Sequence, residues 1–163
     1  MTAHNVDTDL VITRTFDAPV ERVWEAWTQS DHIKKWWGPK DFTAPHVQID
    51  FRVGGKYLYA MHGPKGSPFD MDMWSAGEFR EIVPMQKIVA TDHFADKDGN
   101  YISPNSVGMP GTWADEMIVT VTFEDMGNGK TKLTVVHQGH PTEMVENATM
   151  GWNQQLDKLA AIL

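Results

Sequence analysis

Four histidine and aspartate residues stand where the sequence could support acid–base chemistry. All four lie in stretches whose pattern predicts β-strands: His62, Asp92, His93 and His137. A buried histidine beside a carboxylate can serve as general base in an aldol-type cyclisation or a hydrolysis. Because neighbouring strand residues point to opposite faces, at most one of Asp92 and His93 points inward. The chain lacks cysteine, a serine elbow, a Gly-rich phosphate loop and a nucleotide fingerprint. Its sequence therefore assigns no catalytic residue and leaves enzymatic activity open.

Two motifs have residue types that can bind metal ions. His137 and His140 lie three residues apart in HQGH, but nothing places a third ligand near them. The string DKDGN has some features of a calcium loop, yet Gly99 is fourth rather than sixth and the closing glutamate is absent. We expect a simple turn there, and neither a metal nor a cofactor.

A charged pair within the segment IDFRVGGKYLY could orient a ligand. Asp50 and Arg52 lie two residues apart on a predicted strand and so share a face. With a two-residue turn at the glycine pair, Tyr57 would lie opposite Arg52 and Tyr59 opposite Asp50. The group is either a polar cluster inside a cavity or an exposed ion pair beside a hairpin, and the exposed pair is favoured.

The chain has an acidic balance and an ordinary soluble composition. It has 163 residues and a formal net charge of −8. A negative surface is a poor partner for nucleic acid and for an anionic membrane. The first residues lack the basic and apolar regions of a signal peptide, and no apolar run approaches the roughly 20 residues of a membrane span. We expect a cytoplasmic protein that binds neither nucleic acid nor membranes.

These side chains must be positioned by an α+β arrangement of elements. The pattern predicts one strand, two short helices, about six antiparallel strands joined by turns, and one long C-terminal helix. Apolar residues recur in that helix at steps of three and four: Val145, Ala148, Trp152, Leu156, Leu159 and Leu163. Ser30 and Thr142 are the predicted N-caps of the second and last helices. Gly151, in mid-helix, indicates either close packing against the sheet, which is favoured, or space for a ligand. A strongly curved sheet that grips the long helix satisfies this pattern and leaves room for a cavity.

Several strings together resemble one known family. They are FDAPVERVWEAWT, WWGP, IDFRVGGKY, GEFREIVPMQKIVATDHF, VTVTFED with GKTKLTV, and GWNQQLDKLAAIL. Jointly they resemble the START-type, birch-pollen-allergen-like helix-grip superfamily (SRPBCC), in the branch of activator of heat-shock-protein-90 ATPase homologues. The resemblance runs from about residue 10 to the end. It implies a curved antiparallel sheet of about seven strands wrapped around the C-terminal helix, with two short helices after the first strand.

The resemblance also implies an internal cavity that holds a hydrophobic or amphipathic small molecule, but no single activity. The co-chaperone that gives the branch its name carries an additional domain for its partner. A chain of 163 residues leaves no room for one, so activation of an ATPase is not expected.

Two aromatic segments are candidates for the ends of this cavity. Trp36 and Trp37 end the second short helix, and adjacent helical residues point about 100° apart, so both rings cannot serve one surface. Either both plug the core, or one plugs it and the other lines the cavity. The long segment 97–117 carries Met109 and Trp113 among glycines and prolines, which suits an apolar lid or a mobile surface loop.

We expect residues 1–163 to form a single helix-grip domain with a flexible N-terminus over 1–8. Its expected function is to bind a small apolar or aromatic molecule or a lipid. The alternatives are a polyketide cyclase- or hydrolase-like enzyme and a co-chaperone-like interaction module. An exposed strand edge would permit a homodimer. Strand and helix period predict nine wall residues: Trp37, Met61, Trp74, Phe79, Trp113, Met117, Met150, Trp152 and Leu156.

Overall fold

The computed structural model describes residues 9–163. The flexible N-terminus expected over 1–8 lies outside the described residues. Within the described range the α-helices and strands are β1 (Leu10–Phe16), α1 (Val20–Thr28), α2 (Ser30–Trp36), β2 (Thr43–Ile49), β3 (Lys56–His62), β4 (Asp72–Val83), β5 (Lys87–Ala95), β6 (Met117–Gly127), β7 (Lys130–Gln138) and α3 (Thr142–Ile162). A short 3-10 helix over Pro104–Val107 interrupts the long segment between β5 and β6.

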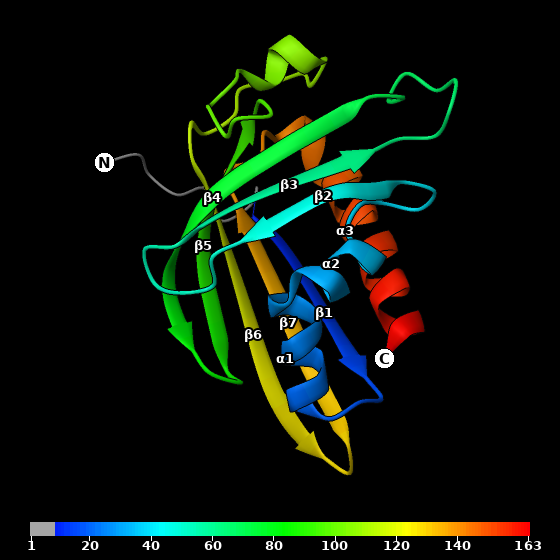
Figure 1. Ribbon diagram of the computed structural model, residues 1–163, viewed down its shortest axis with the longest axis vertical. Coiled ribbons are helices and arrows are strands. Elements are labelled where there is room, and N and C mark those ends of the chain that lie inside the picture. The colour runs from blue at the N-terminus through cyan, green and yellow to red at the C-terminus, as the bar shows by residue number, and fades with distance from the viewer. Residues whose placement is uncertain (1–8) are drawn as a thin grey trace.

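The strands form one antiparallel sheet, and its two edge strands, β1 and β2, follow each other in the sequence. The strand order is β1-β7-β6-β5-β4-β3-β2. Because β1 and β2 lie at opposite edges, the chain between them must cross the sheet, and it does so through α1 and α2. Figure 1 shows the sheet curling around α3, with α1 and α2 beside that helix. The predicted helix-grip architecture is therefore confirmed, including its two short helices and its long last helix.

The two short helices begin and end at identifiable residues. Helix α1 follows Pro19, whose extended backbone occupies the cap position. Helix α2 begins at Ser30 itself, and Gln29 is its cap, so the predicted N-cap at Ser30 is wrong by one residue. The helix ends at Trp36, and two residues later Gly38 has a φ of 92°, which side-chain-bearing residues rarely adopt. The Gly-Pro pair therefore turns the chain out of α2, as its position predicts.

Helix α3 buries one face along its C-terminal half. Trp152, Leu156 and Leu159 are buried there, in agreement with the predicted spacing. The helix begins at Thr142, with the extended Pro141 before it, so Thr142 is the first helical residue rather than the predicted N-cap. Both cap predictions fail for the same reason: the preceding residue already has the extended geometry of the cap, and the hydroxyl residue is already helical.

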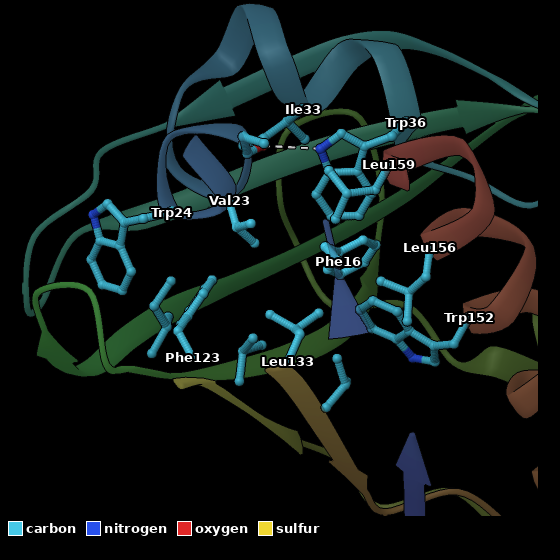
Figure 2. Packing of buried hydrophobic residues seen from close by; sticks show 14 of the residues in the cluster. Phe16, Val23, Trp24, Ile33, Trp36, Phe123, Leu133, Trp152, Leu156 and Leu159 are labelled. Carbon is cyan, nitrogen blue, oxygen red and sulfur yellow. Dashed lines mark hydrogen bonds between the residues drawn. The ribbon is translucent and has the colours of Figure 1, made fainter. Parts of the chain in front are cut away.

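The C-terminal half of α3 packs on α1, α2 and the sheet to form the hydrophobic core. Figure 2 shows Trp36 beside Leu159, with Leu156 and Trp152 further along the same helix. Trp36 is fully buried, and its indole N–H donates a hydrogen bond to the carbonyl oxygen of Ala26 at 2.9 Å. Since buried polar groups need partners, this bond lets a tryptophan occupy a core position without an unsatisfied donor. Core side chains therefore fill the space between the sheet and the C-terminal half of α3.

The hairpin between β2 and β3 differs from its prediction. Ile49 pairs with Tyr57, so the connection is longer than a two-residue turn. The glycines do not form a tight turn. The Gly54 N–H donates a backbone hydrogen bond to the Phe79 carbonyl of β4 at 2.8 Å, so the connection pairs with the neighbouring strand. Asp50 and Arg52 lie in this connection and form an exposed ion pair at 2.9 Å. The favoured interpretation of that pair is confirmed, and a polar cluster with the tyrosines is wrong.

Candidate ligand-binding cavity

A cavity of about 540 Å³ lies between the sheet and α3. Its walls come from the end of α2 and the loop after it, from strands β3 to β7, from the segment between β5 and β6, and from α3. Aromatic and methionine side chains dominate the lining. The volume falls within the range of about 300–1,000 Å³ typical of small-molecule sites. The space is therefore large enough for a ligand of several rings.

Eight of the nine predicted wall residues line this cavity: Trp37, Met61, Trp74, Phe79, Trp113, Met117, Met150 and Trp152. Leu156 does not, because it lies one turn beyond Trp152 toward the plugged end and is fully buried in the core. Met150 is 56% exposed, so it lies at the rim rather than inside. That these residues contact a ligand remains a prediction.

The two adjacent tryptophans have different surroundings. Trp36 belongs to the core and contributes to the cavity floor, whereas Trp37 is only half-buried and lies on the cavity wall. The Trp37 ring meets Tyr59 edge-on, with centroids 5.0 Å apart, and Trp152 at 6.1 Å. Such edge-to-face contacts are favourable and hold ring orientations. The interpretation in which one ring plugs the core and the other lines the cavity is the one that matches the geometry.

The loop that carries Trp37 is anchored to α3 by polar side chains. The Gln155 side-chain oxygen accepts the Gly38 N–H at 2.6 Å. The Lys158 ammonium lies 2.8–3.3 Å from four backbone carbonyls between residues 37 and 42. Because a charged donor strengthens its hydrogen bonds, this contact fixes the loop firmly. Helix α3 therefore holds the loop that carries Trp37 in place, in addition to contributing its own side chains to the cavity wall.

A chain of four polar side chains crosses the otherwise apolar wall. The Tyr57 hydroxyl lies 3.1 Å from Asp92 Oδ1, and Asp92 Oδ2 lies 3.1 Å from His137 Nε2. The last link in this row of side chains joins Trp152 Nε1 to His137 Nδ1, 3.1 Å apart. Three strands and α3 thus bring together residues that are distant in the sequence. Asp92 and His137 are among the candidates that the sequence predicts, whereas Tyr57 is expected opposite Arg52 and Trp152 is predicted only as an apolar wall residue.

The hydrogen-bond pattern determines the tautomer of His137. An indole N–H can only donate, so Trp152 requires His137 Nδ1 to be an acceptor without a proton. The ring proton then sits on Nε2 and is donated to Asp92. Both nitrogens are engaged, so no lone pair is left for a reacting molecule. The histidine orients Asp92 and is itself oriented by α3.

Asp92 is a carboxylate held in its ionised form. Burial alone would raise its pKa, but hydrogen bonds from His137 and Tyr57 outweigh burial and lower the pKa of Asp92 below its usual value. Burial, together with the charge of Asp92, raises the pKa of Tyr57 well above its ordinary value, so the phenol stays protonated. The cavity therefore contains a negative charge that protein donors stabilise on one side.

A glycine allows Tyr57 to reach this carboxylate. Tyr57 lies on β3 opposite Gly77 of β4, and its single hydroxyl proton is shared between the Thr91 carbonyl of β5 at 2.8 Å and Asp92 Oδ1 at 3.1 Å. The ring must therefore cross β4, and a Cβ on Gly77 would overlap both the Thr91 carbonyl oxygen and the Tyr57 ring. The close backbone approach explains why this strand position is glycine. The sequence signal for it was GEF within an otherwise continuous strand pattern.

His140 adds a neutral imidazole next to the polar chain. Its ring meets His137 edge-on, with centroids 4.3 Å apart, and also contacts Trp113 at 5.3 Å. Burial, followed by the neighbouring His137, lowers the pKa of His140 to about 3. Its Nδ1 is buried without a hydrogen-bond partner. His140 thus packs as a small ring between the strand end and the segment before β6.

The other two candidates for acid–base chemistry, His93 and His62, do not join this polar chain. His93 borders the cavity as Asp92 does, but its Nε2 lies 3.4 Å from the Gly99 carbonyl and its ring contacts Tyr101 at the turn, away from the polar chain. His62 bridges Asp72 at 2.7 Å and Asp70 at 2.8 Å, one carboxylate on each ring nitrogen. Since both nitrogens donate, His62 is an imidazolium at the surface. Among residues 9–163 no three His, Asp or Glu side chains are arranged to hold a metal ion.

The long segment before β6 borders the cavity. Trp113 lines it, and its ring meets Phe94 of β5 edge-on at 5.2 Å. The segment is braced from within, because the Asn105 side chain donates to the Met109 carbonyl at 2.7 Å. Where it passes α3, a Cβ on Gly111 would overlap Glu143 and Pro141 at the helix start. The segment is therefore packed against the cavity; whether it opens as a lid remains a prediction.

Comparisons with known proteins agree with this architecture. Residues 17–163 match the family described as activator of Hsp90 ATPase homolog 1-like protein. A crystal structure of a Chromobacterium violaceum protein is 30% identical, with a TM-score of 0.77, covering 95% of this chain and 96% of that one. A solution structure from Arthrobacter aurescens is 25% identical, with a TM-score of 0.78, covering 99% and 90% of the two chains.

A third structure, the AHSA1 protein of Silicibacter pomeroyi, shares the fold at 23% identity and a TM-score of 0.74, covering 94% of this chain and 95% of that one. Among curated proteins none matches the chain. None of the helices in the described part of the chain combines the length and apolar character that crossing a membrane requires. On the strength of the match over residues 17–163, the chain belongs to the family of activator of Hsp90 ATPase homolog 1-like proteins.

Proposed function

We propose that the protein binds a small, largely apolar molecule in the cavity between its sheet and α3. The observation that carries the proposal is a space of about 540 Å³ walled by aromatic rings and methionines, with one cluster of converging polar groups. Apolar lining supplies most of the binding energy in such sites, and a few placed polar groups orient the ligand. Membership of the family supports a helix-grip cavity without naming its occupant.

Native mass spectrometry of the freshly purified protein tests this proposal. A discrete added mass that leaves on denaturation would support it and would identify the ligand class by weight. If the protein is isolated empty, a panel of naphthalene-sized aromatic probes should still bind and quench tryptophan fluorescence, because Trp37, Trp113 and Trp152 line the cavity. An empty protein that binds no probe would overturn the proposal.

A pair of tryptophan substitutions on α3 separates cavity binding from surface binding. Ala148 is half-buried and lines the cavity, whereas Ala160 is exposed on the same helix. Ala148→Trp should occupy the space and abolish probe binding. Ala160→Trp adds the same side chain outside the cavity and should leave binding unchanged. Equal binding by the two variants would place the ligand elsewhere.

One observation favours a second function, a cyclase- or hydrolase-like enzyme. Asp92 is a carboxylate on an otherwise apolar wall with acceptor sites that its protein partners leave open, so it can take a proton from a bound molecule, although its lowered pKa makes it a weaker base than a free carboxylate. His137 cannot take that role because both of its ring nitrogens are engaged. Incubation with cavity-sized aromatic ketones and esters, followed by product analysis, tests it. Turnover that is lost in Asp92→Asn would establish the enzyme; the absence of any product would leave the binding function alone.

A further inference from the structure

We propose that the cavity selects a neutral aromatic molecule bearing a hydrogen-bond donor, such as a phenol or an arylamine, and rejects aromatic carboxylates of the same size. This inference rests on the proposed binding function and names the class of ligand. It follows from the charges of the lining, from the acceptor left free on Asp92, and from the rings around it.

The lining residues that the structure describes include one carboxylate, Asp92, and no lysine or arginine to balance it. The nearest ammonium on α3, Lys158, is engaged with backbone carbonyls behind the Trp37 loop. A ligand carboxylate would therefore meet a like charge in an apolar space without a cation to neutralise it. Like-charge contacts of this kind oppose binding strongly.

Asp92 retains acceptor capacity that its protein partners do not use. A carboxylate has about four lone-pair sites, and Tyr57 and His137 occupy one on each oxygen. The Asp92 side chain is still 15% exposed and lies on the cavity wall. Tyr57 donates its single proton within the wall, and His137 has no free nitrogen. The polar chain therefore offers an incoming molecule a negatively charged acceptor on Asp92.

The surrounding rings favour a flat aromatic body. On one side the Trp37 ring meets both Tyr59 and Trp152 edge-on, and on another Phe94 meets Trp113 edge-on. Aromatic pairs gain from offset or edge-to-face geometry beyond their buried area. An aromatic ligand can add to both groups while its hydroxyl or amino hydrogen reaches Asp92. A flexible acid such as a fatty acid has neither feature.

A matched series of naphthalene probes tests the proposal in the unmodified protein by isothermal titration calorimetry. Naphthol carries a donor, its methyl ether does not, and naphthoate carries a negative charge. Naphthol should bind about tenfold more tightly than the ether, as expected for one hydrogen bond to a charged acceptor. Naphthoate should bind at least about a hundredfold more weakly than naphthol.

Asp92→Asn provides a test whose two effects have opposite signs. Its amide oxygen can still accept from His137, and its NH₂ can donate to the Tyr57 oxygen, whose proton goes to Thr91. The variant should weaken naphthol binding about tenfold and strengthen naphthoate binding by at least that factor. A substitution that merely loosened the fold would weaken both. Asp50→Asn, in the exposed ion pair with Arg52, removes the same charge outside the cavity and serves as control.

Each outcome decides between the proposals. Naphthoate binding as tightly as naphthol, or a naphthol preference that survives Asp92→Asn, would overturn the inference while leaving the cavity function intact. Failure of all three probes to bind would overturn both together. Loss of the preference in Asp50→Asn as well would assign the selectivity to net charge rather than to Asp92, and would also overturn the inference.

Discussion

Replacing Gly151 with alanine should stabilise the protein, although the position lies in mid-helix over the cavity. A glycine in a helix interior costs about 0.8–1.0 kcal/mol relative to alanine. Built on Gly151, a Cβ would meet only Pro39 Cγ at 3.7 Å, an ordinary van der Waals distance. Close packing against a strand, the favoured explanation for this glycine, is therefore wrong. We expect a gain of about 1 kcal/mol, or roughly 2–4 °C in melting temperature for a chain of this size.

Thermal and urea unfolding followed by circular dichroism measure this gain. Gly77→Ala is the matched control, because the same methyl would overlap the Thr91 carbonyl and the Tyr57 ring. That substitution should destabilise the protein and displace Tyr57 from Asp92. Probe binding should survive Gly151→Ala, since one methyl removes little of a cavity of about 540 Å³. A loss of stability in Gly151→Ala would refute the reasoning, because it would mean that the loop after α2 lies closer to α3.

Three further predictions concern other parts of the fold. Trp36→Phe should lower the free energy of unfolding by about 2–3 kcal/mol, because a buried carbonyl loses its donor and a void remains; in the same urea titration Trp37→Phe should cost less, and it should weaken naphthol binding. Hydrogen bonds to two carboxylates raise the pKa of His62 above 6.5. A raised folded-state pKa gives stability that is complete below the unfolded value and is lost as the pH rises through the folded value. The melting temperature of wild type relative to His62→Asn should therefore fall as the pH increases above 6.5, and parallel pH profiles would contradict this. Lys158→Met should cost about 1–2 kcal/mol and broaden the Trp37 indole NMR signal, since the loop loses its charged donor; an unchanged signal would argue that Gln155 alone holds the loop.

Element types and much of the cavity wall could be predicted because they depend on local periodicity. Alternating strands, the step pattern of α3 and the Gly-Pro stop after α2 all agree with the structure. Eight of nine wall residues line the cavity, and for those on strands and on α3 the period indicates the face that a side chain takes, whereas Trp37 and Trp113 lie outside helices and strands. Leu156 does not line the cavity, because the same face of α3 contacts the hydrophobic core near its C-terminus and the cavity further toward its N-terminus. The helical period indicates the face but not which of the two it meets.

By itself, the sequence determined the α+β order of elements and the apolar stripe of α3, but it left open whether Trp37 plugs the core with Trp36 or lines the cavity. It could not determine the polar chain, because Tyr57, Asp92 and His137 come from three strands whose register depends on long-range pairing. Only the tertiary structure brought the Trp152 N–H to His137 and so fixed the tautomer. Only close backbone approach at Gly77 let Tyr57 cross a strand to reach the carboxylate. Local periodicity sets which way a side chain points, whereas sheet curvature and strand pairing decide what it meets there.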